Sequence, residues 1–219
     1  ATGYSYNADN TELTIGLRQG VTFHDGTPFN ADAVVYVFNR LKNSSGAMRT
    51  GTVSWMKTIE KTIEYEVRIT VNAPRGYAVS SLAAEGPLMI SPAADKKYGQ
   101  DFGRHPVGTG PFKFVEYKRG ESIKLVKNPD YFKKGRPYLD AIEFKIVENR
   151  STRILAFTAG DFDMTFPTDI TIPLGRDMKT QAPKAVCEFG PTGVANNLIV
   201  NRTSAPFDNA QIRKAMSLA

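Results

Sequence analysis

Hydrophobic and polar residues alternate in several short segments, which predicts half-buried β-strands. In the segment 13–17, Leu13, Ile15 and Leu17 are separated by a threonine and a glycine. Residues two apart lie on the same face of a strand, so this segment is expected to bury one face. The same pattern predicts a β-ribbon over 59–71 with its turn near 64–65, and strands over 112–117, 122–127, 141–147, 163–166, 185–189 and 197–201.

After residue 30 the spacing of the apolar residues becomes that of a helix. Apolar residues recur every three or four positions from Ala31 to Leu41, which places them on one face of a helix. Asn30 is a suitable N-cap, and Phe29 can pack against Val34 across the first turn. Further helices are predicted over 76–84, 92–98, 152–158 with Gly160 as C-cap, and 211–219.

Two glycine-containing turns separate these elements. Asp25 and Gly26 predict a tight turn, because glycine tolerates positive φ and an aspartate side chain can accept hydrogen bonds from nearby backbone. Gly108, Thr109 and Gly110 lie in a Gly/Pro-rich segment that predicts a subdomain boundary. Both turns are interpreted as structural, with ligand contact at the second as the alternative.

The composition is that of an ordinary globular protein. The chain has 219 residues, a net charge of +6, 41% hydrophobic and 23% charged residues, which excludes collagen-like, coiled-coil and disordered classes. No apolar stretch approaches the roughly 20 residues of a membrane helix. The basic stretch 113–136 is interrupted by Glu116, Glu121 and Asp130. We therefore interpret it as a solvated face, and no nucleic-acid partner is expected.

The sequence lacks the motifs of common catalytic and metal sites. It contains no G-x-S-x-G, H-E-x-x-H or C-x-x-C pattern, and its single cysteine, Cys187, excludes an internal disulfide. The two histidines, His24 and His105, lie far apart in loops. We expect no enzymatic activity, no cofactor and no metal.

Six motifs occur in a fixed order along the chain. They are 17–35 (Leu-Arg-x-Gly-Val-x-Phe-His-Asp-Gly-Thr-Pro-Phe-Asn-Ala-Asp-Ala-Val-Val), 105–112 (His-Pro-Val-Gly-Thr-Gly-Pro-Phe), 127–132 (Lys-Asn-Pro-Asp-Tyr-Phe), 159–163 (Ala-Gly-Asp-Phe-Asp), 206–209 (Pro-Phe-Asp-Asn) and 212–215 (Ile-Arg-Lys-Ala). Together they resemble the family 5 extracellular solute-binding proteins of ABC importers, the peptide/nickel-binding group. The resemblance runs from about residue 6 to residue 219.

The resemblance implies an α/β fold with mixed sheets, of the periplasmic-binding-protein-like type II, present here as one incomplete lobe. Residues 1–105 would form the accessory subdomain of lobe I and residues 106–219 part of its main α/β subdomain, with lobe II absent. The predicted last helix carries no stop signal before Ala219, which also leads us to expect a part of a longer protein.

In function, the resemblance implies the substrate-binding component of an ABC importer. It would capture short peptides and deliver them to a membrane permease, as a monomer when full length. Such a protein would be exported, either to the periplasm or as a cell-surface lipoprotein. Two alternatives stay open: binding of a nickel chelate or another small solute, and a sensory or interaction module that keeps the fold without transport.

The resemblance also suggests ligand-binding residues. Nickel-binding relatives supply an arginine and a tryptophan from the segment after the first helix, where this chain has Arg49 and Trp55 at a different spacing. The alternative for Trp55 is a packing anchor. Those relatives also place an arginine where Gly86 stands, so its absence argues against a metal chelate and leaves room for a larger ligand. Glu85, Gly86 and Met89 are therefore candidate peptide contacts.

Overall fold

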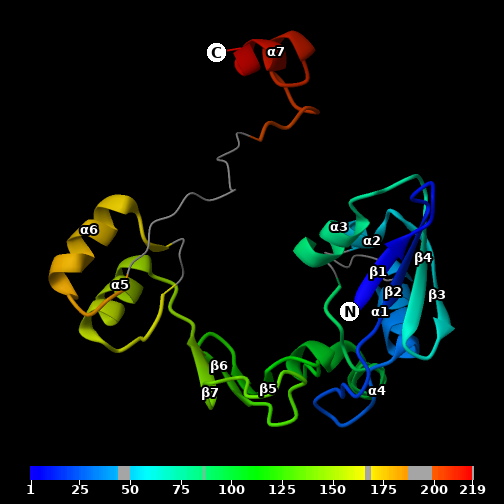
Figure 1. Cartoon of the computed structure of the whole chain (residues 1–219). Coiled ribbons are helices and arrows are strands. Elements are labelled where there is room, and N and C mark those ends of the chain that lie inside the picture. The colour runs from blue at the N-terminus through cyan, green and yellow to red at the C-terminus, as the bar shows by residue number, and fades with distance from the viewer. Residues whose placement is uncertain (44–49, 86, 166–168, 187–198, 219) are drawn as a thin grey trace. The chain divides into compact units, whose positions relative to one another are not determined.

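The computed structural model describes residues 1–43, 50–85, 87–165, 169–186 and 199–218. The chain forms two compact units, Ala1–Val147 and Glu148–Ala219 (Figure 1). The mixture of helices and sheets agrees with the predicted fold class. The predicted subdomain boundary between residues 105 and 106 falls inside the first unit and stays a prediction.

An antiparallel four-stranded sheet carries the core of the first unit. Its strands are β1 (Gly3–Tyr6), β2 (Glu12–Gly16), β3 (Met56–Ile63) and β4 (Glu66–Val71), in the order β1-β2-β4-β3. Leu13 of β2 lies opposite Ile69 of β4, and both are completely buried. The alternating pattern thus predicted β2 and the β3–β4 ribbon correctly. Strand β1 was not predicted; its Tyr4 is 61% exposed, and its place depends on pairing with β2.

Helix α1 (Ala31–Asn43) packs on this sheet (Figure 1). Its predicted N-cap is confirmed, because the Asn30 side-chain oxygen accepts a hydrogen bond from Ala33 N–H at 3.2 Å. Its buried face joins the same core as Leu13. The unit continues with α2 (Thr50–Val53), α3 (Ala78–Glu85), α4 (Pro92–Tyr98) and the 3-10 helix η1 (Gly99–Arg104), which confirms the helices predicted near 76–84 and over 92–98.

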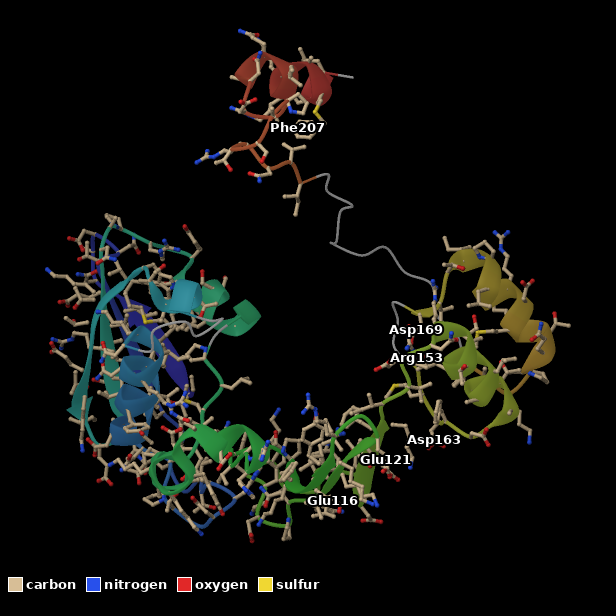
Figure 2. The ribbon with its side chains drawn as sticks, turned by 180° about the vertical axis from the view of Figure 1, so that it is seen from behind. Glu116, Glu121, Arg153, Asp163, Asp169 and Phe207 are labelled. Carbon is tan, nitrogen blue, oxygen red and sulfur yellow. The ribbon has the colours of Figure 1, made fainter. Side chains whose placement is uncertain are left out.

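A second antiparallel sheet contains β5 (Phe112–Lys118), β6 (Ser122–Lys127) and β7 (Ala141–Lys145), in sequence order. Its basic residues pair with acids on the same sheet: Lys118 Nζ lies 3.9 Å from Glu116 and 3.8 Å from Glu121, both labelled in Figure 2. Lys145 Nζ lies 2.9 Å from Glu143. These pairs make the basic stretch an interleaved surface of both charges, in keeping with a solvated face.

The second unit contains α5 (Arg150–Ala159), α6 (Ile172–Gln181) and α7 (Ala210–Leu218). Gly160 ends α5 with a φ of 88°, which confirms the predicted C-cap. The sequence did not predict α6. Its start is set locally by Thr171, whose hydroxyl accepts a hydrogen bond from Leu174 N–H, but its apolar residues are too sparse for a clear helical period.

The three strands predicted for this part of the chain differ from the structure. Residues 163–165, 185–186 and 199–201 are not strands, and the remaining residues of those segments, with Cys187, lie outside the described part of the chain. Alternation over four or five residues produces a strand only where a partner strand supplies hydrogen bonds. Within the described residues, none of these segments has one.

An arginine–aspartate cluster fixes the start of α5. Arg153 places its Nε 2.9 Å and its Nη2 2.7 Å from the two carboxylate oxygens of Asp169, and the two side chains lie together in Figure 2. Arg150 donates to the Asp169 carbonyl oxygen. The hydrogen bond from Arg153 lowers the pKa of Asp169 below its usual 3.8, and a bond from the Thr165 hydroxyl adds to it.

We expect the second unit to lose stability at acid pH through this cluster. A carboxyl with a lowered folded pKa stabilises the protein above its unfolded value, and this contribution disappears as the pH falls below 3.8 through the folded pKa. Asp169→Asn should make the free energy of unfolding depend less on pH in this range. The measurement is urea unfolding followed by circular dichroism from pH 6 to pH ~2. The control is Asp163→Asn, at an exposed position. Equal profiles for the two variants would contradict the expectation.

Candidate ligand-binding site

The structure describes three of the five predicted ligand residues at least in part. Trp55 lies directly before β3, Glu85 is the last residue of α3, and Met89 lies in the segment between α3 and α4. Arg49 and Gly86 lie outside the described residues. Trp55 and Met89 are therefore the predicted ligand residues whose side-chain surroundings the structure describes.

Trp55 is a buried part of the core. Its side chain is in the main hydrophobic cluster and only 8% of the residue is exposed. The indole Nε1 donates to the Thr52 carbonyl oxygen at 2.7 Å, which satisfies its one polar group inside the protein. The geometry favours the packing-anchor alternative for most of this side chain.

One face of Trp55 is covered by an arginine that the sequence analysis did not single out. The Arg75 guanidinium carbon lies 5.3 Å from the Trp55 ring and 4.6 Å from the Tyr77 ring, distances typical of cation–π contacts. We call these three residues the arginine–aromatic cluster. In the sequence Arg75 directly precedes the helix predicted over 76–84 and Tyr77 lies in its first turn, a placement that gives no sign of the contact with Trp55.

An apolar cavity of about 150 Å³ lies beside Met89. It is lined by Pro87, Leu88 and Ile90 from the predicted ligand segment, and by Val37, Arg40, Leu41 and Phe102 from α1 and η1. Met89 itself is half-buried against the main core. This cavity could accommodate one small apolar side chain.

The charge of Arg40 at this cavity is compensated within the protein. Its Nε donates to the buried carboxylate of Asp95 at 2.7 Å, and the Tyr36 hydroxyl donates to the same oxygen at 2.7 Å. Burial raises the pKa of Tyr36, and its bond to Asp95 adds to the shift. The remaining lining of the cavity is therefore effectively apolar.

The two predicted turns meet at His24. Its backbone N–H donates to the Gly108 carbonyl oxygen at 2.9 Å, and its Nε2 lies 3.0 Å from the Gly110 carbonyl oxygen. The buried Asn128 side chain donates to the same Gly110 oxygen at 3.0 Å. These bonds hold the 108–110 segment in place, which accounts for a structural role of this turn.

The Asp25–Gly26 turn is also tied to α4. The hydroxyl of Ser91, which is fully buried, donates to the Asp25 carboxylate at 2.5 Å and accepts a bond from Ala94 N–H as the N-cap of α4. Partial burial by itself would raise the pKa of Asp25, but its hydrogen bonds from Ser91 and Thr27 outweigh that effect and lower it. The turn, α4 and the 108–110 segment are thus connected by hydrogen bonds, and Ser91, the residue after the 87–90 segment, is part of this connection.

The described residues contain no group of three or more His, Cys, Asp or Glu side chains arranged to hold a metal ion. Nor do they include a helix long and apolar enough to cross a membrane. The chemistry available near Trp55 and Met89 is an arginine held by aromatic rings and an apolar cavity, which suits binding of an organic solute.

Comparison with known proteins places this chain in a family. The model of the bacterial extracellular solute-binding proteins, family 5, middle region, matches residues 1–219. Curated relatives named glutathione-binding protein GsiB are 33% identical in Pectobacterium atrosepticum and 34% in Salmonella typhi, each over 100% of this chain. The chain spans 42% of the length of each.

Solved structures show the same fold. MoaA from A. tumefaciens R10, in complex with mannopinic acid, has a TM-score of 0.84 and 28% identity over 99% of this chain and 44% of its own. AgaA, in complex with agropinic acid, has a TM-score of 0.70 and 32% identity over 74% of this chain and 33% of its own. DppA from Helicobacter pylori, in complex with peptide STSA, has a TM-score of 0.66 and 29% identity over 74% of this chain and 36% of its own. The predicted periplasmic-binding-protein fold is confirmed.

Proposed function

The chain belongs to family 5 of the bacterial extracellular solute-binding proteins, and we propose that it supplies one wall of a site that captures short peptides for an ABC importer. One observation carries this proposal. Relatives named for glutathione, itself a tripeptide, match the chain from end to end at 33–34% identity. A related fold holds a peptide in DppA.

We propose that the ligand wall includes Arg49, Glu85, Gly86 and Met89, together with the apolar cavity beside Met89, and that the buried Trp55 supports this wall from the core. Peptide ligands are commonly held by backbone hydrogen bonds, with side chains in separate pockets. A cavity of about 150 Å³ next to the 87–90 segment fits this division of roles. Full-length protein would work as an exported monomer, periplasmic or lipid-anchored, that passes its ligand to a membrane permease without altering it.

A second candidate ligand class is supported by two of the solved structures. MoaA and AgaA hold mannopinic acid and agropinic acid, and AgaA is 32% identical to this chain over the aligned part. A carboxylate-bearing small solute of that kind is therefore the alternative to a peptide.

Binding by the full-length gene product tests the proposal. We expect glutathione or a tripeptide such as Ala-Ala-Ala to bind with a Kd on the order of 1 μM, about −8 kcal/mol, in isothermal titration calorimetry. Agropinic acid and mannopinic acid serve as competing probes. The peptide should be recovered intact by mass spectrometry, because binding and not hydrolysis is proposed. Folded protein that binds none of the peptides would contradict the proposed function, and preferential binding of agropinic acid would establish the second candidate.

A further inference from the structure

The arginine–aromatic cluster places a charged group against two aromatic rings. Arg75 is half-buried, Tyr77 is 61% exposed and Trp55 is buried. The guanidinium carbon lies 5.3 Å from the centre of the anchored indole and 4.6 Å from the centre of a ring at the surface. One side of the arginine is supported by the core, and the cluster reaches solvent.

The backbone around Arg75 is held in place. Its N–H donates to the Asn10 carbonyl oxygen at 3.0 Å, and its own carbonyl oxygen accepts from Ala78 N–H at 3.2 Å. Two residues beyond Tyr77, Val79 N–H donates to the Tyr6 hydroxyl at 3.2 Å. The start of α3 is thus tied to β1 and to the loop before β2, so Arg75 is presented on a fixed support.

The guanidinium lacks an acidic partner in the part of the chain that the structure describes. Neither an ion pair nor a side-chain hydrogen bond involves its N–H groups there. By contrast, Arg40 and Arg153 each bond to a buried aspartate. The two ring contacts supply no oxygen acceptor, so the N–H donors of the Arg75 guanidinium, whose fork matches the two oxygens of a carboxylate, are not bonded to an acid among the described residues.

From this arrangement we propose that Arg75, held by Trp55 and Tyr77, binds a carboxylate group of the solute. The inference rests on the proposed solute-binding function and specifies the ligand group that this chain recognises. It also agrees with the ligands named for the relatives, because glutathione, mannopinic acid, agropinic acid and the peptide STSA all carry carboxylates. Trp55 then acts as a positioning residue that orients the arginine from inside the core.

The test compares a free acid with its amide in the full-length gene product. Calorimetry is performed with Ala-Ala-Ala and Ala-Ala-Ala-amide on the unchanged protein, Arg75→Gln and Arg75→Lys. The matched control is Arg68→Gln, which removes the same charge at an exposed position of β4. Melting temperatures show whether each variant is folded. If Arg75→Gln does not fold, Arg75→Lys takes its place as the test variant.

We expect the unchanged protein to bind the acid at least tenfold more tightly than the amide. Arg75→Gln should bind the acid about tenfold more weakly and abolish the preference, Arg75→Lys should retain part of it, and Arg68→Gln should retain all of it. Equal binding of acid and amide by the unchanged protein, or full affinity for the acid in folded Arg75→Gln or Arg75→Lys, would overturn the inference while the proposed function stands. Absence of peptide binding by the unchanged protein would overturn both.

Discussion

Replacement of Leu13 with alanine is expected to lower the free energy of unfolding of the Ala1–Val147 unit by about 2–5 kcal/mol. Leu13 is completely buried at the centre of the four-stranded sheet, opposite the equally buried Ile69. Its truncation removes apolar contacts and leaves a cavity that the paired strands cannot readily close. This is the largest effect that we expect from a single substitution.

The chain contains a suitable probe for this measurement. Trp55 is the only tryptophan among the 219 residues, and it packs in the same core as Leu13. Urea unfolding of the chain followed by its fluorescence therefore reports on this unit. Leu139→Ala is the matched control, since Leu139 is 61% exposed, and its effect should stay within about 0.5 kcal/mol. A Leu13→Ala variant no less stable than this control would show that the core is assigned wrongly.

The second large effect is expected from Ser91→Ala, which should lower the free energy of unfolding by about 1–3 kcal/mol. The Ser91 hydroxyl is fully buried and has two roles, because it caps α4 at Ala94 N–H and donates to the Asp25 carboxylate. Alanine removes both hydrogen bonds. It leaves the Ala94 N–H without its cap, and it should raise the pKa of Asp25 toward the usual 3.8.

Ser80→Ala provides the comparison, because Ser80 is an exposed residue of α3 and alanine is favourable in helices. Its stability should be unchanged or slightly higher in the same urea experiment. Asp25→Asn should reproduce only part of the loss caused by Ser91→Ala, because the cap on α4 survives. If Ser91→Ala and Ser80→Ala unfolded at the same urea concentration, the connection between the Asp25–Gly26 turn and α4 would carry no measurable stability.

The candidate site was predicted from the sequence only in outline. The resemblance directed attention to the segments around Trp55 and Met89, and the structure places the arginine–aromatic cluster and an apolar cavity at those two places. The resemblance did not indicate Arg75, which is 20 positions beyond Trp55 in the sequence. An arginine in a loop has no pattern that reveals which rings will cover it. The whole contact depends on the segment before α3 and the residue before β3 meeting in space.

Several features followed from the sequence because they depend on neighbouring residues. Strand alternation around Leu13, the Asn30 cap, the turn at Gly26 and the Gly160 C-cap are set by side-chain period, local hydrogen bonds and backbone conformation. The order of six short motifs likewise predicted the family that the comparison confirmed.

Other features were decided only by the tertiary structure, because they join residues far apart in the chain. The alternating segments that include residues 163–165 and 185–186 had no partner strand among the described residues and did not become strands there. Trp55 is buried and packs in the core. Ser91 bonds to Asp25, which is 66 residues away in the sequence, and the Arg75 guanidinium contacts two aromatic rings. Local pattern determines which elements form. The free energy of packing determines which side chains meet, and that in turn determines which charge is available to a ligand.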